Sequence, residues 1–110
     1  MSVLIVSCDA VLREEIAECL SGTSESVFEA EDSFSAIVLA ERVLPATVFI
    51  DIALPFSGLS SFKKELKRVS PECKVVAICS KYTICKTIFG ENSTIYKPVV
   101  ELDVLHAVGC

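Results

Sequence analysis

The stretch PATVFIDIALP, residues 45–55, places one acid at the end of an apolar run. Residues 47–51 read TVFID, a short β-branched and aromatic run typical of a strand buried inside a sheet. A carboxylate inside such a run is costly unless it is paired or lies where the strand opens to solvent. We therefore expect Asp51 to be the last residue of its strand and to face a polar partner.

Four further apolar runs resemble this strand, and segments with helical spacing separate them. The predicted strands are residues 2–7, 27–30, 47–51, 74–79 and 94–97. The predicted helices are residues 9–20, 33–44, 59–69 and 99–108, with a short and poorly patterned segment at 81–89. Alternation of strands and helices implies right-handed crossovers and a five-stranded parallel sheet covered on both faces. The predicted fold class is therefore a doubly wound α/β fold.

Length and composition predict one globular domain over residues 1–110. Of its residues 52% are hydrophobic and 23% are charged, which is enough apolar surface for a core. The formal charge of −5 argues against direct nucleic-acid binding, because phosphate backbones repel a net anion. No apolar stretch is long enough to cross a bilayer, and the first ten residues do not read as a signal peptide. We expect a soluble, cytoplasmic protein without membrane partners.

Six cysteines raise the alternatives of a disulfide framework or a zinc site. The sequence contains no C-x-x-C pair, and His106 is its only histidine. These observations favour reduced thiols, with Cys8 and Cys79 as small buried residues. His106 is expected on the surface.

Polar side chains gather where the predicted strands end. In a doubly wound sheet, ligands bind beyond the carboxyl ends of the strands. Asp9, Asp51, Cys79, Ser80 and Lys97 all lie at or just after such ends. A carboxylate next to a lysine suits phosphoryl transfer, because cations must offset the accumulating negative charge. Mg²⁺ held by carboxylates is a second cation that such a site can use.

Four motifs in order resemble the receiver domain of bacterial response regulators, and the likeness covers nearly all of the chain. They are VLIVSCDA at residues 3–10, PATVFIDIALP at 45–55, KVVAICS at 74–80 and IYKP at 95–98. The resemblance implies a flavodoxin-like three-layer sandwich. It also implies that Asp51 accepts a phosphoryl group from a histidine kinase or phosphotransfer protein, and that Lys97 contacts this group. The Lys97–Pro98 bond is then expected to be cis.

The resemblance further implies that the chain is a switch in a two-component phosphorelay rather than an enzyme. Its expected partners are then a second copy of the chain or an effector domain. The switch residue of the family aligns with Cys79, or with Ser80 if the strand slips by one. The chain departs from the family at the two adjacent acids that normally organise Mg²⁺, since Ser7 and Cys8 stand at those positions. Only a weak Mg²⁺ site is expected, from Asp9, Asp51 and the backbone carbonyl of Ala53.

Two alternatives to a phosphorylated receiver remain. In the first, the missing acids abolish metal-assisted transfer, and the domain is a pseudo-receiver that acts as a phosphorylation-independent dimerisation or docking module. An unrelated nucleotide- or flavin-binding protein has little support, because SCDAVL at residues 7–12 contains none of the glycines of a phosphate-binding loop.

Overall fold

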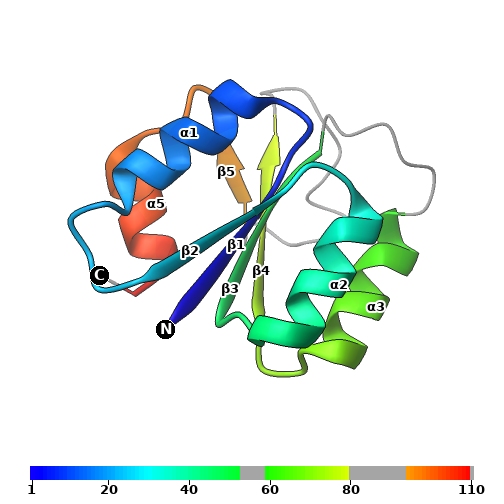
Figure 1. The fold of residues 1–110 in the computed structure, drawn as a ribbon. Coiled ribbons are helices and arrows are strands. Elements are labelled where there is room, and N and C mark those ends of the chain that lie inside the picture. The colour runs from blue at the N-terminus through cyan, green and yellow to red at the C-terminus, as the bar shows by residue number, and fades with distance from the viewer. Residues whose placement is uncertain (53–58, 80–93, 110) are drawn as a thin grey trace.

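The computed structural model describes residues 1–52, 59–79 and 94–109. Five parallel strands form one sheet in the order β2-β1-β3-β4-β5 (Figure 1). The strands are β1 Ser2–Val6, β2 Ser26–Ala30, β3 Thr47–Asp51, β4 Lys74–Cys79 and β5 Thr94–Tyr96. The helices are α1 Ala10–Cys19, α2 Ser33–Val43, α3 Leu59–Val69 and α5 Glu101–Ala107. The predicted doubly wound α/β fold is confirmed.

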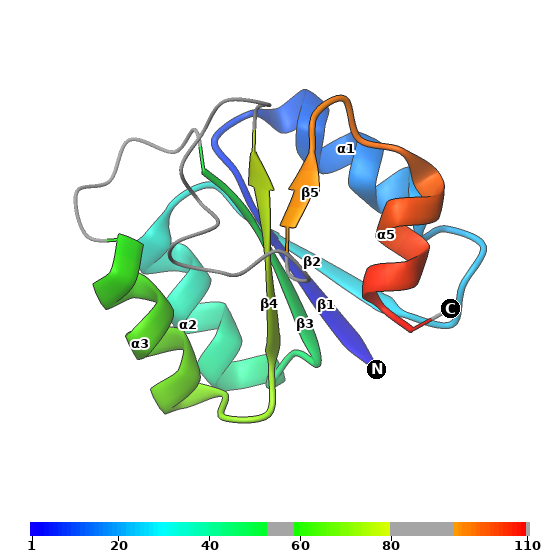
Figure 2. The same ribbon diagram turned by 180° about the vertical axis from the view of Figure 1, so that it is seen from behind.

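Helices cover both faces of the sheet, with α1 and α5 on one face and α2 and α3 on the other (Figures 1 and 2). Alternate strand residues therefore point into two separate cores. Leu4 and Val48 belong to the core under α2 and α3, whereas Ile5 and Phe49 belong to the core under α1 and α5. Burial on both faces explains why the central strands read as unbroken apolar runs.

Two aspartates begin helices next to the sheet. Asp9 caps α1, since its carboxylate accepts hydrogen bonds from the backbone N–H groups of Val11 and Leu12. Asp32 caps α2 in the same way through the N–H of Ser35. Asp9 thus stands at the start of the helix predicted for residues 9–20.

The ends of the later elements differ from the prediction by one or two residues. Leu44, at φ 47°, ends α2 in the left-handed conformation directly before Pro45. Helix α5 begins at Glu101, two residues later than predicted, because Val100 stays extended as its N-cap. The Lys97–Pro98 bond is cis, as predicted.

The poorly patterned segment at 81–89 lies outside the described residues. In the part of the chain that is described, no helix has the length and apolar character needed to cross a membrane.

Candidate functional site at the carboxyl edge of the sheet

Asp51 is the last residue of β3 and is only 1% exposed. One of its carboxylate oxygens, Oδ1, lies 3.1 Å from Nζ of Lys97, and the other, Oδ2, accepts a 2.7 Å hydrogen bond from the hydroxyl of Ser7. The strands explain this meeting, because β3 lies between β1 and β4 and the three carboxyl ends share one edge. The structure therefore gives Asp51 the polar partners that its position in an apolar run requires.

Lys97 reaches Asp51 from the end of β5. Its backbone N–H donates to the carbonyl of Cys79 at 2.8 Å, which continues the β4–β5 ladder by one residue. Its side chain is 33% exposed, so Lys97 contacts the buried carboxylate and also reaches solvent. The juxtaposition of Asp51 and Lys97 is as predicted, and their chemical roles stay predictions.

Ser7 also contacts Asp51, which sequence reasoning did not predict. It is fully buried, and its backbone N–H donates to the carbonyl of Ala30 at 3.0 Å. Its hydroxyl oxygen accepts the N–H of Asp9 at 3.0 Å, while its single proton goes to Asp51. Ser7 thus connects the loop after β1 to the carboxylate at the end of β3.

Arg13 of α1 holds the same loop from the outside. Its guanidinium donates to the carbonyl of Ser7, and its Nε lies 3.1 Å from Oε1 of Glu29 on β2. In the sequence Arg13 has the pattern of an ordinary solvent-facing helix residue, so no local signal marks this role. The bridge fixes where Ser7 can place its hydroxyl.

The predicted magnesium site is not assembled by the described residues. Asp9 directs Oδ1 to the start of α1, and Cys8 is exposed, which contradicts its prediction as a small buried residue. Ala53, the third predicted ligand, lies outside the described ranges. Within those ranges no group of three or more His, Cys, Asp or Glu side chains could hold a metal ion. A hydroxyl and a thiol are poor substitutes for two carboxylates, so this loop does not fit Mg²⁺.

Cys79 requires a further correction. It is buried at the end of β4 as predicted, but it is disulfide-bonded, and the free cysteines Cys8, Cys19 and Cys73 are not its partner. The prediction of reduced thiols is therefore wrong at this position. A disulfide sulfur has no S–H to donate, which removes the role of a hydrogen-bonding switch from Cys79. Ser80, the alternative, lies outside the described residues.

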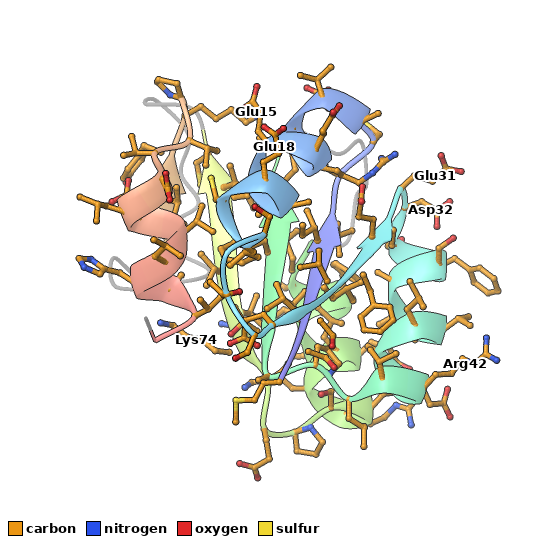
Figure 3. All side chains as sticks on the ribbon, turned by 60° about the vertical axis from the view of Figure 1, so that its left-hand side comes forward. Glu15, Glu18, Glu31, Asp32, Arg42 and Lys74 are labelled. Atoms are coloured by element: carbon orange, nitrogen blue, oxygen red, sulfur yellow. The ribbon has the colours of Figure 1, made fainter. Side chains whose placement is uncertain are left out.

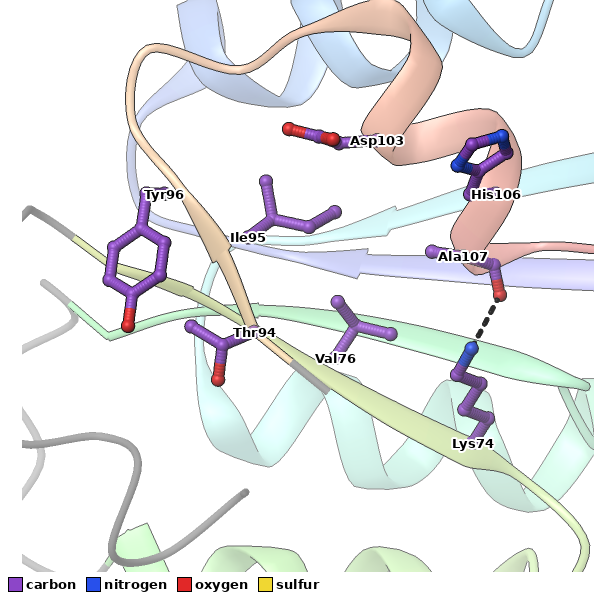
Figure 4. A pocket seen from close by; sticks show the side chains of 8 residues that line it. All are labelled: Lys74, Val76, Thr94, Ile95, Tyr96, Asp103, His106 and Ala107. Carbon is purple, nitrogen blue, oxygen red and sulfur yellow. Dashed lines mark hydrogen bonds between the residues drawn. The ribbon is translucent and has the colours of Figure 1, made fainter. Parts of the chain in front are cut away.

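Two hollows lie near β5. The smaller adjoins the site, between α1 and the Lys97–Pro98 step, and Asp9 and Glu15 line it. The larger lies between β5 and α5, where Asp103 and His106 face Ile95 and Lys74 (Figure 4). There the ammonium of Lys74 donates to the carbonyl of Ala107 at 3.2 Å. His106 is exposed, as predicted, and is not one of the residues around Asp51.

Comparisons with known proteins agree with this geometry at the level of the fold. No family model matches the chain. A cyclic di-GMP phosphodiesterase of Thermotoga maritima is 33% identical over 118 aligned positions, which cover 98% of this chain and 31% of the relative. The chain thus spans about a third of the length of the curated relative that it matches.

Solved structures give the class of fold. The chemotaxis response regulator CheY4 of Vibrio cholerae superposes with a TM-score of 0.80 at 17% identity, over 97% of this chain and 94% of that one. A putative response regulator of Chloroflexus aurantiacus gives 0.82 at 20% identity, over 97% and 93%. NtrX of Brucella abortus, in complex with ADP, gives 0.81 at 25% identity, over 97% of this chain and 25% of that one. The chain has the fold of a response regulator receiver domain.

Proposed function

We propose that this chain is a receiver domain of a two-component signalling pathway, in which Asp51 accepts a phosphoryl group from a histidine kinase or phosphotransfer protein. The observation that carries the proposal is the buried Asp51 carboxylate with the Lys97 ammonium 3.1 Å away at the carboxyl edge of the sheet. The proposal also draws on the fold, which is that of receiver domains.

In the proposed transfer, an oxygen of Asp51 attacks the phosphorus of a phosphohistidine. The P–O bond to Asp51 forms as the P–N bond breaks, and the imidazole leaves with its electron pair. Lys97 offsets the negative charge that accumulates on the phosphoryl oxygens. Because the loop after β1 does not fit Mg²⁺, the transfer proceeds on this chain's own residues and shows little dependence on the metal.

As a receiver, the chain acts as a switch rather than as an enzyme. Phosphorylation adds negative charge beside Lys97 and takes one carboxylate oxygen out of its present contact, either Oδ1 with Lys97 or Oδ2 with Ser7. The resulting change at the ends of β1 and β5 is the signal that an effector domain reads. The Thermotoga relative is named as a phosphodiesterase and is about three times as long, and we propose that this chain corresponds to a regulatory part of such a protein.

A second candidate function is a pseudo-receiver, and the contact between Ser7 and Asp51 favours it. A carboxylate that is 2% exposed, and whose oxygens are bonded to a hydroxyl and an ammonium, is poorly accessible to an incoming phosphoryl group. In this alternative the domain serves as a phosphorylation-independent docking or dimerisation module.

Incubation with acetyl phosphate or phosphoramidate, followed by mass spectrometry, distinguishes the two candidates. The receiver function predicts a single phosphoryl adduct that maps to Asp51, is lost in Asp51→Asn and forms with or without Mg²⁺. Asp9→Asn is the matched control, because asparagine also caps helices and the adduct should persist. No adduct under conditions that label another receiver domain would contradict the proposal and favour the pseudo-receiver.

A further inference from the structure

Arg13 is the one basic residue of α1, and two contacts hold its side chain beside the loop after β1. The guanidinium donates to the carbonyl of Ser7, and Nε lies 3.1 Å from Oε1 of Glu29 on β2. Two acids of the same helix, Glu15 and Glu18, instead line a hollow between α1 and the start of α5 (Figure 3). Arg13 is thus fixed between the loop and β2, with only 18% of its side chain exposed.

The contact made by Arg13 continues through Ser7 to the carboxylate of Asp51. The hydroxyl of Ser7 donates to Oδ2 of Asp51 at 2.7 Å, while Nζ of Lys97 lies 3.1 Å from Oδ1. A serine oxygen is one rotatable bond away from the backbone, so its position follows that of the backbone. A series of contacts therefore joins Glu29, which is partly exposed, through Arg13 and Ser7 to Asp51.

The two oxygens of Asp51 have different roles in the proposed phosphorylated state. Attack by Oδ1 places the phosphoryl group beside Lys97 and leaves Oδ2 as the carbonyl oxygen that faces Ser7. When water later attacks the phosphorus, its P–O bond forms as the bond to Oδ1 breaks. Asp51 leaves as a carboxylate with the electron pair, and the proton of the water passes to solvent. A hydrogen bond to Oδ2 strengthens as this charge develops, so it lowers the barrier to loss of the phosphoryl group.

We propose that Ser7 stabilises the departing carboxylate, that Arg13 is the positioning residue for Ser7, and that together they shorten the lifetime of the phosphoryl group on Asp51. Ser7 touches the reacting carboxylate, whereas Arg13 acts only through Ser7. The inference rests on the proposed function and adds how long the switch stays phosphorylated.

The decay of the phosphoryl adduct measures this lifetime. The chain is labelled with acetyl phosphate, the donor is removed by gel filtration, and the remaining adduct is followed by mass spectrometry. Ser7→Ala should lengthen the half-life by about tenfold, the usual effect of one hydrogen bond to a charged group. Arg13→Met should lengthen it by about threefold or more, and should add nothing to Ser7→Ala. An unchanged half-life in Ser7→Ala, or an equal effect of Arg13→Met in its absence and presence, would overturn the proposal.

Three further variants separate positioning from a general loss of a basic residue. A lysine can still donate to the Ser7 carbonyl, so Arg13→Lys should restore most of the fast decay. Glu29→Gln weakens the hold on Arg13 without removing it, and its half-life should lie between those of the unsubstituted chain and Arg13→Met. Arg42 is exposed on α2, away from α1 (Figure 3), so Arg42→Met should leave the half-life unchanged. Equal half-lives of Arg42→Met and Arg13→Met would overturn the positioning role.

Decay in water enriched in a heavy oxygen isotope identifies the bond that breaks. Attack on phosphorus puts the heavy oxygen in inorganic phosphate, which we expect, whereas attack on the carbonyl carbon puts it in Asp51. Heavy oxygen in Asp51 would overturn the role of Ser7 as the partner of a departing carboxylate. An adduct that forms but decays equally fast in Ser7→Ala contradicts this inference alone. The absence of an adduct in every variant contradicts the proposed function as well.

Discussion

Two halves of the site lie at the same edge of the sheet and differ in chemistry. The half formed by β3 and β5 has an acid and a cation, Asp51 and Lys97, in direct contact. The half formed by the loop after β1 has a buried hydroxyl, an exposed thiol and an acid that caps α1. The receiver fold forms around both halves, which shows that the fold does not need acids in the first loop.

The comparison explains what Ser7 does. A carboxylate at position 7 would add a second negative charge beside Asp51 and would require another cation. The hydroxyl of Ser7 instead donates a hydrogen bond to Asp51, and the Lys97 ammonium lies beside the same carboxylate. We therefore propose that Ser7, in place of an acid, lets the site at Asp51 function without a bound metal ion.

The largest expected loss of stability follows from removal of the Lys97 ammonium. Lys97→Met removes the ammonium beside the buried carboxylate of Asp51 and should lower the free energy of unfolding by about 3 kcal/mol. Urea denaturation measures this loss. The double variant Lys97→Met with Asp51→Asn removes both charges and should recover most of the stability. Equal losses in the single and double variants would show that the pair is not coupled.

Removal of the hydroxyl should have the next largest effect. Ser7→Ala removes the donor to Asp51 and the acceptor for the N–H of Asp9, at a cost of about 1.5 to 2 kcal/mol of unfolding free energy. The neighbouring Cys8→Ser is the control, and at an exposed position it should change stability by less than about 0.5 kcal/mol. Equal losses of unfolding free energy in both variants would show that the buried hydroxyl contributes no more to stability than the exposed thiol.

The cap of α1 should contribute less. Asp9→Ala removes the acceptor for Val11 and Leu12 and should reduce the unfolding free energy by about 1 kcal/mol. Asp9→Asn keeps a capping oxygen and should be nearly neutral. If Asp9→Asn is as damaging as Asp9→Ala, the charge of Asp9 has a role in the site beyond capping.

The smallest effect concerns pH and the corresponding cap of α2. The backbone N–H of Ser35, and then its hydroxyl, hold the pKa of Asp32 below its ordinary value of 3.8. Because the pKa is lower in the folded state, this stabilisation is complete above the unfolded value and is lost as pH falls through the folded value. Asp32→Asn should flatten the acid end of the stability profile slightly. A profile identical to that of the unsubstituted chain would show that Asp32 makes no such contribution.

The sequence predicts the sheet and the Asp51–Lys97 contact because both follow from local rules. Buried strands have unbroken apolar runs, and parallel strands bring their carboxyl ends to one edge. The end of β5 and the start of α5 were less predictable. There an extended Val100 replaces the helical turn that the apolar pattern suggested.

The parts of the site that sequence reasoning missed depend on contacts between distant residues. Ser7 and Asp51 are 44 positions apart, and nothing in the local pattern shows that the Ser7 hydroxyl turns toward β3. Arg13 contacts the carbonyl of Ser7, six positions earlier, and Glu29 on β2, sixteen positions later, and its helical pattern signals neither contact. The disulfide at Cys79 has no short-range C-x-x-C signal, and burial alone predicted a thiol.

Titration with Mg²⁺, followed by NMR at the backbone amide of Asp51, tests whether Ser7 makes the site independent of metal. We expect no saturable shift at Asp51 in the unsubstituted chain. A saturable shift should appear once Ser7→Asp and Cys8→Asp introduce two hard oxygen ligands. Saturable Mg²⁺ binding at Asp51 in the unsubstituted chain, of the same strength as in the double variant, would contradict the claim that Ser7 makes the site independent of metal.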